Sequence, residues 1–126
     1  EHDMSNQRPL VVVNGTIQQM VPSVLTLAYA ASITLDFDPA LSPYQQVTLA
    51  GDLTLLSPSA NLGGGRALSL LIIGDGSIRN LTFPAGWSFL GSAAPATLAA
   101  GKKAVLSLTS YGALDADVIA AYAAVP

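Results

Sequence analysis

The strongest constraint on the fold of this chain lies in residues 46–83, where apolar and polar residues alternate in short runs. In residues 47–56, one side of an extended chain would be entirely apolar and would carry Val47, Leu49, Leu53 and Leu55. The opposite side would carry mainly polar residues. Because this period of two fits a half-buried strand and no helix, we predict a strand over residues 47–56.

Two more strands are expected in the same stretch. Residues 67–73 are apolar on both sides, so this strand should lie centrally in a sheet. The sequence Gly74-Asp75-Gly76-Ser77 follows, and these residues accept the backbone angles of a tight turn. We therefore predict a hairpin between residues 67–73 and a third strand over residues 78–83.

Composition favours one all-β domain that associates with other copies. The chain has 126 residues, 51% of them hydrophobic and only 10% charged, and its eleven Gly and eight Pro are scattered between apolar runs. Such a low charged share implies a surface that is neutral or buried against other copies. The net charge of −3 and the lack of a basic stripe argue against nucleic-acid binding.

The chain divides into three parts. Residues 1–3 are predicted to be a leftover of recombinant expression, with Met4 as the natural start. Residues 4–22 form an arm or hairpin, because Asn14-Gly15 between two β-rich runs is a strong hairpin signal. Residues 23–126 form the β-sandwich domain. The longest apolar region, residues 20–35, contains Pro22 and is too short to span a bilayer, so no membrane insertion is expected.

The sandwich should contain further strands after residue 23. Residues 32–38 place Ile33, Leu35 and Phe37 inward, and residues 102–109 form another strand. Residues 117–125 are ambiguous, because their Ala content favours a helix and their position after many strands favours a strand. We choose the strand. The expected fold is an antiparallel β-sandwich of jelly-roll type with an N-terminal hairpin or arm.

A resemblance to a known group of proteins is clearest from residue 65 to residue 89 and, with residues 47–55, Asn61 and residues up to 108, covers most of the chain. The residues that carry it are Arg79-Asn80-Leu81-Thr82-Phe83-Pro84, Trp87, Gly91, Ala94-Pro95, Leu98 and the strand from Lys103 to Leu108. This pattern resembles a small β-domain of tailed-bacteriophage structural proteins, found near the C-termini of tail fibres and in capsid decoration proteins. Residues 8–20 are similar to a leader found on phage virion proteins.

The resemblance implies a non-enzymatic component of the virion surface, often trimeric and assembled in the cytoplasm of the bacterial host. Its partners would be further copies of itself and other virion proteins of the capsid or the tail. In this interpretation the arm docks on a neighbouring subunit through main-chain pairing and through Val11, Val12 and Val13.

A carbohydrate-binding module that recognises a host surface glycan is the alternative function. Aromatic rings pack on the apolar faces of sugars, and Tyr44 and Tyr111 are the candidate contacts. Trp87 and Phe89 could join such a patch, but a lone Trp in a small β-domain more often fills the core.

The sequence predicts no catalytic site, no cofactor and no metal. Asp36 and Asp38 share a strand face, but a chain without Cys and with its single His and single Glu in residues 1–3 offers no further ligand or base. The Asp75-Gly76-Ser77 sequence lacks the ligand spacing of a calcium loop, and the Gly63-Gly64-Gly65-Arg66 sequence lacks the Lys-Ser or Lys-Thr of a phosphate loop. We interpret both as turns between strands.

Overall fold

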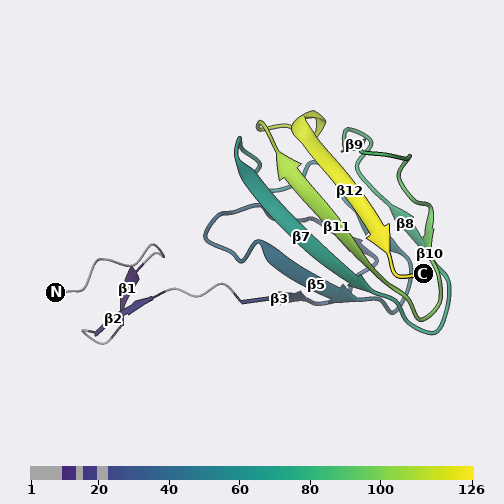
Figure 1. Ribbon diagram of the computed structural model, residues 1–126, viewed down its shortest axis with the longest axis horizontal. Helices are drawn as coiled ribbons and strands as arrows, with labels where there is room; N and C mark the ends of the chain where they lie inside the picture. Colours follow the sequence, from purple (N-terminus) through teal and green to yellow (C-terminus); the bar gives the residue numbers. More distant parts are fainter. Residues whose placement is uncertain (1–9, 14–15, 20–22) are drawn as a thin grey trace.

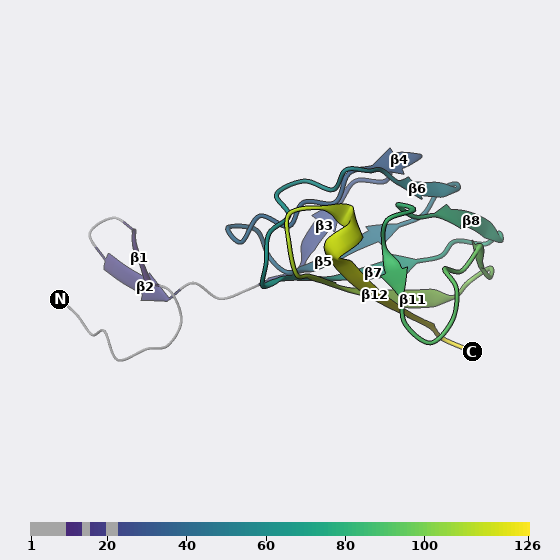
Figure 2. The same cartoon turned by 90° about the horizontal axis from the view of Figure 1, so that it is seen from above.

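The computed structural model describes residues 10–13, 16–19 and 23–126, with side chains from residue 23 onward. Within these residues the chain forms a two-stranded hairpin, a four-stranded sheet and a six-stranded sheet (Figure 1). The larger two sheets form two layers that face each other, as Figure 2 shows from above. Helical structure in the described part is limited to one 3-10 turn at Asp115–Asp117. The all-β prediction is confirmed.

The strands alternate between the two layers. The six-stranded sheet has the order β3 (Leu25–Leu27), β5 (Tyr44–Thr48), β7 (Arg66–Ile73), β11 (Lys103–Ser110), β12 (Val118–Ala124), β9 (Ser88–Phe89). The four-stranded sheet has the order β10 (Thr97–Leu98), β8 (Arg79–Thr82), β6 (Leu53–Leu55), β4 (Ser32–Ile33).

From β3 to β10 each strand lies in the opposite layer from the strand before it. A chain that crosses to the other layer and returns comes back in its original direction. The neighbours β3, β5 and β7 are therefore parallel, and so are β4, β6 and β8. Only β11 and β12 form a hairpin within one layer, antiparallel to each other and, through β11, to β7.

The expected antiparallel order is thus corrected to two mixed sheets. A jelly roll contains antiparallel strands joined as Greek keys, whereas here most neighbouring strands before β11 are parallel. The physical reason is that successive strands bury their apolar sides from opposite layers against one shared core. The alternation of apolar residues specifies which side of a strand is buried. It does not specify which other strand is its neighbour in the sheet.

The single strand predicted over residues 47–56 is wrong, because the chain turns a corner inside it. β5 ends at Thr48, and β6 begins at Leu53 in the other layer. The Tyr29 hydroxyl donates a hydrogen bond to the Asp52 carbonyl oxygen at 2.8 Å and closes this corner. A side chain at Gly51 would collide with that hydroxyl.

The hairpin predicted at Gly74-Asp75-Gly76-Ser77 is also wrong, since this segment crosses between the layers. β7 is paired on both sides, to β5 and to β11, so it offers no edge to the strand that follows. The crossing is held by a salt bridge of 2.6 Å between Asp75 and Arg79. The same turn residues can therefore connect strands of different layers as well as the two strands of a hairpin.

The core between the layers is built largely from leucine. All four residues predicted to face inward in residues 47–56 are buried, and so are Leu35 and Phe37. The final strand was the correct choice for the C-terminal segment, because β12 buries Val118 and Ala120 against this core. The full buried set is Leu35, Phe37, Val47, Leu49, Leu53, Leu55, Leu68, Leu70, Ile72, Leu81, Trp87, Leu98, Ala104, Leu106, Leu108, Val118 and Ala120.

The N-terminal hairpin has the register expected from the sequence. β1 (Leu10–Val13) and β2 (Thr16–Gln19) are antiparallel, with Val13 opposite Thr16. The turn residues Asn14 and Gly15 lie outside the described residues, as do residues 1–3 and the remainder of the predicted arm.

Asp115 links the segment of residues 57–59 to the segment that carries Trp87. Its carboxylate accepts hydrogen bonds from the Ser57 hydroxyl at 2.5 Å, from the Ser59 hydroxyl at 2.8 Å and from the Trp87 indole nitrogen at 3.2 Å. Burial acts to raise the pKa of the Asp115 carboxyl, but the hydrogen bonds from Ser57, Ser59 and Trp87 outweigh it, so the pKa lies below its usual value.

We expect Asp115→Asn to lower the free energy of unfolding at pH 7 by about 1–2 kcal/mol. The reason is that the hydroxyls of Ser57 and Ser59 and the indole nitrogen of Trp87 would lose a charged acceptor. A lowered folded-state pKa stabilises the fold above the unfolded pKa of about 3.9 and less so as pH falls below it. The wild type should therefore lose more stability than the variant between about pH 5 and pH 2. Urea unfolding across this pH range measures both effects, and Asp38→Asn is the control. If the free energy of unfolding changed equally with pH in the wild type and in Asp115→Asn, the stabilising role of the Asp115 carboxylate would be contradicted.

Two glycines of the Gly74-Asp75-Gly76-Ser77 crossing provide a matched test of its geometry. A Cβ at Gly74 would lie 2.6 Å from the Lys102 carbonyl oxygen and 3.3 Å from Leu98, whereas a Cβ at Gly76 would meet nothing within 4 Å. Gly74→Ala should destabilise the protein by about 1–3 kcal/mol. Gly76→Ala should stay within about 0.5 kcal/mol of the wild type in the same denaturation measurement. Equal free energies of unfolding for the two variants would contradict the close contact between Gly74 and the Lys102 carbonyl oxygen.

Candidate interaction surfaces

The outward side of the six-stranded sheet is a broad face without a covering layer. On β5, β7, β11 and β12 the inward side chains are buried in the core, so the alternate residues point away from it. We call this surface the outer face. Across these four strands it consists of Tyr44, Gln46, Thr48, Ala67, Ser69, Leu71, Ile73, Lys103, Val105, Ser107, Thr109, Ile119, Ala121 and Ala123.

Residues of the outer face lie in rows that cross the strands in register. The rows are Thr48, Ile73, Lys103; Gln46, Leu71, Val105, Ala123; Tyr44, Ser69, Ser107, Ala121; and Ala67, Thr109, Ile119. The second row is the most apolar, and Val105 in its middle is 40% exposed. At its end, the Gln46 amide nitrogen donates to the Thr26 hydroxyl of β3 at 3.1 Å.

Charge is excluded from the outer face except at one corner, where Lys103 begins β11. In residues 23–126 the other charged side chains lie in loops, crossings and strand ends. Asp52, for example, accepts hydrogen bonds from the Asn80 main chain and side chain beside the four-stranded sheet. The result is a surface of hydroxyl, amide and apolar groups with a single charge at its corner.

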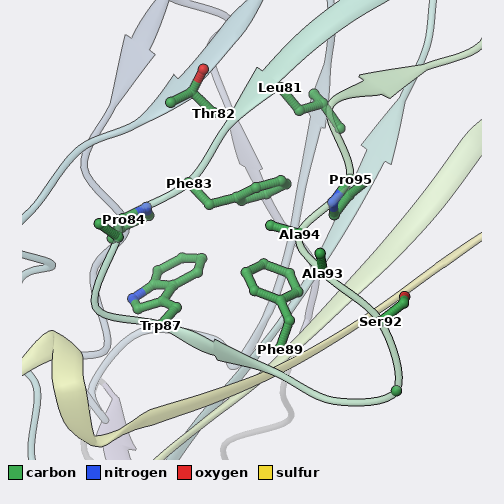
Figure 3. Close-up of a pocket in the computed structure, with 12 residues that line it drawn as sticks. Leu81, Thr82, Phe83, Pro84, Trp87, Phe89, Ser92, Ala93, Ala94 and Pro95 are labelled. Atoms are coloured by element: carbon green, nitrogen blue, oxygen red, sulfur yellow. The ribbon is translucent and has the colours of Figure 1, made fainter.

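A hollow of about 690 Å³ lies beside the edge strand β9. Figure 3 shows the rings of Phe83, Trp87 and Phe89 on one side of it and the segment 91–95 on the other. The Phe83 ring centroid lies 5.2 Å from that of Phe89 and 6.2 Å from that of Trp87. We call this site the aromatic hollow.

The aromatic hollow has no charged residue in its lining. Its polar side chains are the hydroxyls of Thr82 and Ser92, and the segment 91–95 contributes only small residues and Pro95. Trp87 is 6% exposed and directs its indole nitrogen to Asp115, in agreement with the prediction that it belongs to the core. A lining with aromatic rings and no charged side chain favours an uncharged occupant.

The two tyrosines predicted to contact a partner or a glycan are exposed but separate. Tyr44 is 56% exposed at the start of β5, and Tyr111 is 72% exposed just after β11. β7 lies between these two strands, and the tyrosines belong to different cross-strand levels. Neither lines the aromatic hollow. The structure therefore does not bring them together into one aromatic patch.

The other predicted contacts are Val11, Val12 and Val13. Their main chain forms β1, which pairs with β2, and their side chains lie outside the described residues.

The polar side chains with a potential chemical role form hydrogen bonds within the chain. One oxygen of Asp36 accepts from the Asp38 main-chain nitrogen at 2.9 Å and from the Asn61 amide nitrogen at 2.7 Å. Arg66, next to the glycine-rich loop, donates to the Asn61 carbonyl oxygen. The hydrogen bond from Arg79 lowers the pKa of the Asp75 carboxyl.

Residues 23–126 and the hairpin strands contain no cluster of three or more His, Cys, Asp or Glu residues suited to a metal ion. The same residues contain no helix with the length and apolar character needed to cross a bilayer.

Comparison with protein-family models, with curated proteins and with solved structures finds no match to this chain. The class that the fold defines is an all-β protein with two facing mixed sheets.

Neither surface was singled out from the sequence. A signal for the outer face was available, since the outward positions of β5, β7, β11 and β12 include only one charged residue, Lys103. No comparable signal exists for the aromatic hollow. It depends on the meeting of Phe83 with Phe89 and on the course of the segment 91–95, which are products of the tertiary fold.

Proposed function

We propose that this protein is a non-enzymatic structural component of the surface of a tailed bacteriophage, and that its copies associate through the outer face, as a trimer. The single observation that carries the self-association is the exclusion of charge from four adjacent strands of a solvent-exposed sheet. The phage assignment is supported by the resemblance that covers most of the chain and is clearest from residue 65 to residue 89.

The size of the outer face suits an interface. Four strands spaced about 4.8 Å apart, each covering about seven residues at 3.3 Å per residue, give a projected area of roughly 450 Å². The largest apolar patch of a typical monomer has a similar area, about 300–600 Å², and is often functional. On the outer face, apolar residues alternate with hydroxyl and amide groups. The row Gln46, Leu71, Val105, Ala123 supplies the apolar centre, with hydroxyl-bearing residues on one side of it. An apolar centre with a polar rim is the usual arrangement of protein interfaces.

A second copy is the favoured occupant because the outer face offers no charge pattern for a different partner. An interface selects an unlike partner largely by complementary charge, and a neutral surface lacks that means of selection. The low charged content of the whole chain, 10%, is consistent with burial of surface between copies.

The placement of one positive charge tests the proposed interface. Val105→Lys puts a charge at the apolar centre of the outer face, where burial without a partner would cost several kcal/mol, so the oligomer should dissociate. Ile78→Lys is the matched control, because Ile78 is 67% exposed and lies outside this face. Sedimentation or light scattering at micromolar concentration should give a smaller mass for Val105→Lys only. A monomeric wild type, or equal masses for all three proteins, would contradict the proposal.

The location in the particle is tested by the position of the gene. A gene beside that of the major capsid protein supports a decoration protein, and a gene among tail genes supports a fibre or adhesin. A setting without any virion gene would contradict the phage assignment.

Glycan binding is the second candidate, and the exposure of Tyr111 is the observation that favours it. At 72% exposed, this ring is available for stacking on a sugar. Because Tyr44 lies two strands away, each tyrosine would act alone, and the affinity should be weak. A glycan array should then show binding that Tyr111→Ala abolishes and Tyr44→Ala leaves nearly unchanged. Absence of binding to any bacterial surface polysaccharide would exclude this function.

A further inference from the structure

We propose that the aromatic hollow is the docking site for residues 10–13 of a second copy of this chain. This inference deepens the proposed self-association and rests on it. It names the receiving site for the N-terminal arm, a site formed by Phe83, Trp87, Phe89 and the segment 91–95.

The chemistry of the hollow favours an uncharged occupant. Its volume of about 690 Å³ lies within the range of roughly 300–1,000 Å³ that is typical of binding pockets. Three aromatic residues line one side, and no charged group is available to pair with a charged ligand. A bound ionised group would therefore lose its hydration without compensation.

The hollow also lies beside an open sheet edge. β9 is the last strand of the six-stranded sheet and pairs with β12 on one side only. The segment 91–94 next to it is exposed, and among the described residues it makes no main-chain hydrogen bond to the rest of the chain. Both segments offer main-chain groups to an added extended chain, while alternate side chains of that chain would enter the hollow. This is the geometry of recognition by strand addition.

Residues 10–13 meet these requirements. They are Leu, Val, Val and Val, and residues 9–20 contain no charged residue. In the described part of the chain their strand β1 pairs only with β2. An isolated two-stranded hairpin is marginally stable in water, so this segment gains from a partner.

As long as β1 stays paired with β2, the docked segment must come from another copy, because Gln19 of the same chain cannot reach the far edge of the sheet. The arm joins the sandwich at β3, which lies at the opposite edge of the six-stranded sheet from β9. Five strand spacings of 4.8 Å separate these edges by about 24 Å. The six residues from position 19 to position 25 span at most about 21 Å when fully extended.

Disulfide trapping tests this proposal directly, because the chain has no cysteine and hence no background. A Val12→Cys protein is mixed with an Ala93→Cys protein under mild oxidation, so that only contact between copies yields a mixed dimer. The matched control replaces Ala93→Cys by Ala40→Cys, an exposed alanine in the loop before β5. We expect the mixed dimer to form at least about 10-fold faster with Ala93→Cys than with Ala40→Cys.

A charge in the arm provides the second test. Residues 10 and 12 share one side of an extended strand, so Leu10→Asp should slow trapping between Val12→Cys and Ala93→Cys on the order of 10-fold. Ser5→Asp, placed outside the strand, should leave the rate unchanged. Equal trapping rates at Ala93 and Ala40, or faster formation of the Val12–Val12 dimer, would overturn the proposal.

The failure of this inference is distinguishable from the failure of the proposed function. A wild-type oligomer that Val105→Lys dissociates, together with trapping at Ala93 no faster than at Ala40, would overturn the arm site and leave self-association standing. A monomeric wild type without trapping would overturn both.

Discussion

The pairing of β7 on both of its long edges is the constraint on which the rest of the fold depends. β7 is parallel to β5 over five residue pairs and antiparallel to β11 over eight, and its Leu70 and Ile72 are fully buried. Because both edges are filled, the chain that leaves β7 cannot turn back beside it and must cross to the other layer. The parallel strands β3 and β5 and the antiparallel hairpin of β11 and β12 therefore meet at this strand.

The sequence was sufficient to predict which residues face the core. Period-two alternation placed Val47, Leu53 and Phe37 correctly, because it reflects which side of a strand is buried. The central position of residues 67–73 followed from their apolar character on both sides, and it is confirmed by β7. Even the ambiguous C-terminal segment was predicted correctly, since Val118 and Ala120 complete the core despite a local preference for helix.

The partners of the strands could not be predicted in the same way. A turn such as Gly74-Asp75-Gly76-Ser77 has the same local chemistry in a hairpin and in a crossing between layers. The corner after β5 depends on the hydroxyl of Tyr29, a residue distant in sequence from the Asp52 carbonyl that it contacts. The aromatic hollow depends likewise on Phe83 and Phe89 from different elements. The exposure of Tyr44 and Tyr111 says nothing of where they lie relative to each other. Local sequence patterns therefore predict well which side chains are buried, and they predict poorly which strands and side chains become neighbours.

The two proposed contacts between copies would have complementary roles. An interface without charge depends little on ionic strength, and its rows of small side chains allow neighbouring alignments to be nearly equal in energy. The outer face alone would supply area without fixing how the copies are aligned. Insertion of residues 10–13 into a single hollow would restrict that alignment, because the same segment would have to pair with β9 and contact Phe83 and Phe89. In this arrangement the sheet supplies the contact area of the assembly and the arm supplies its specificity.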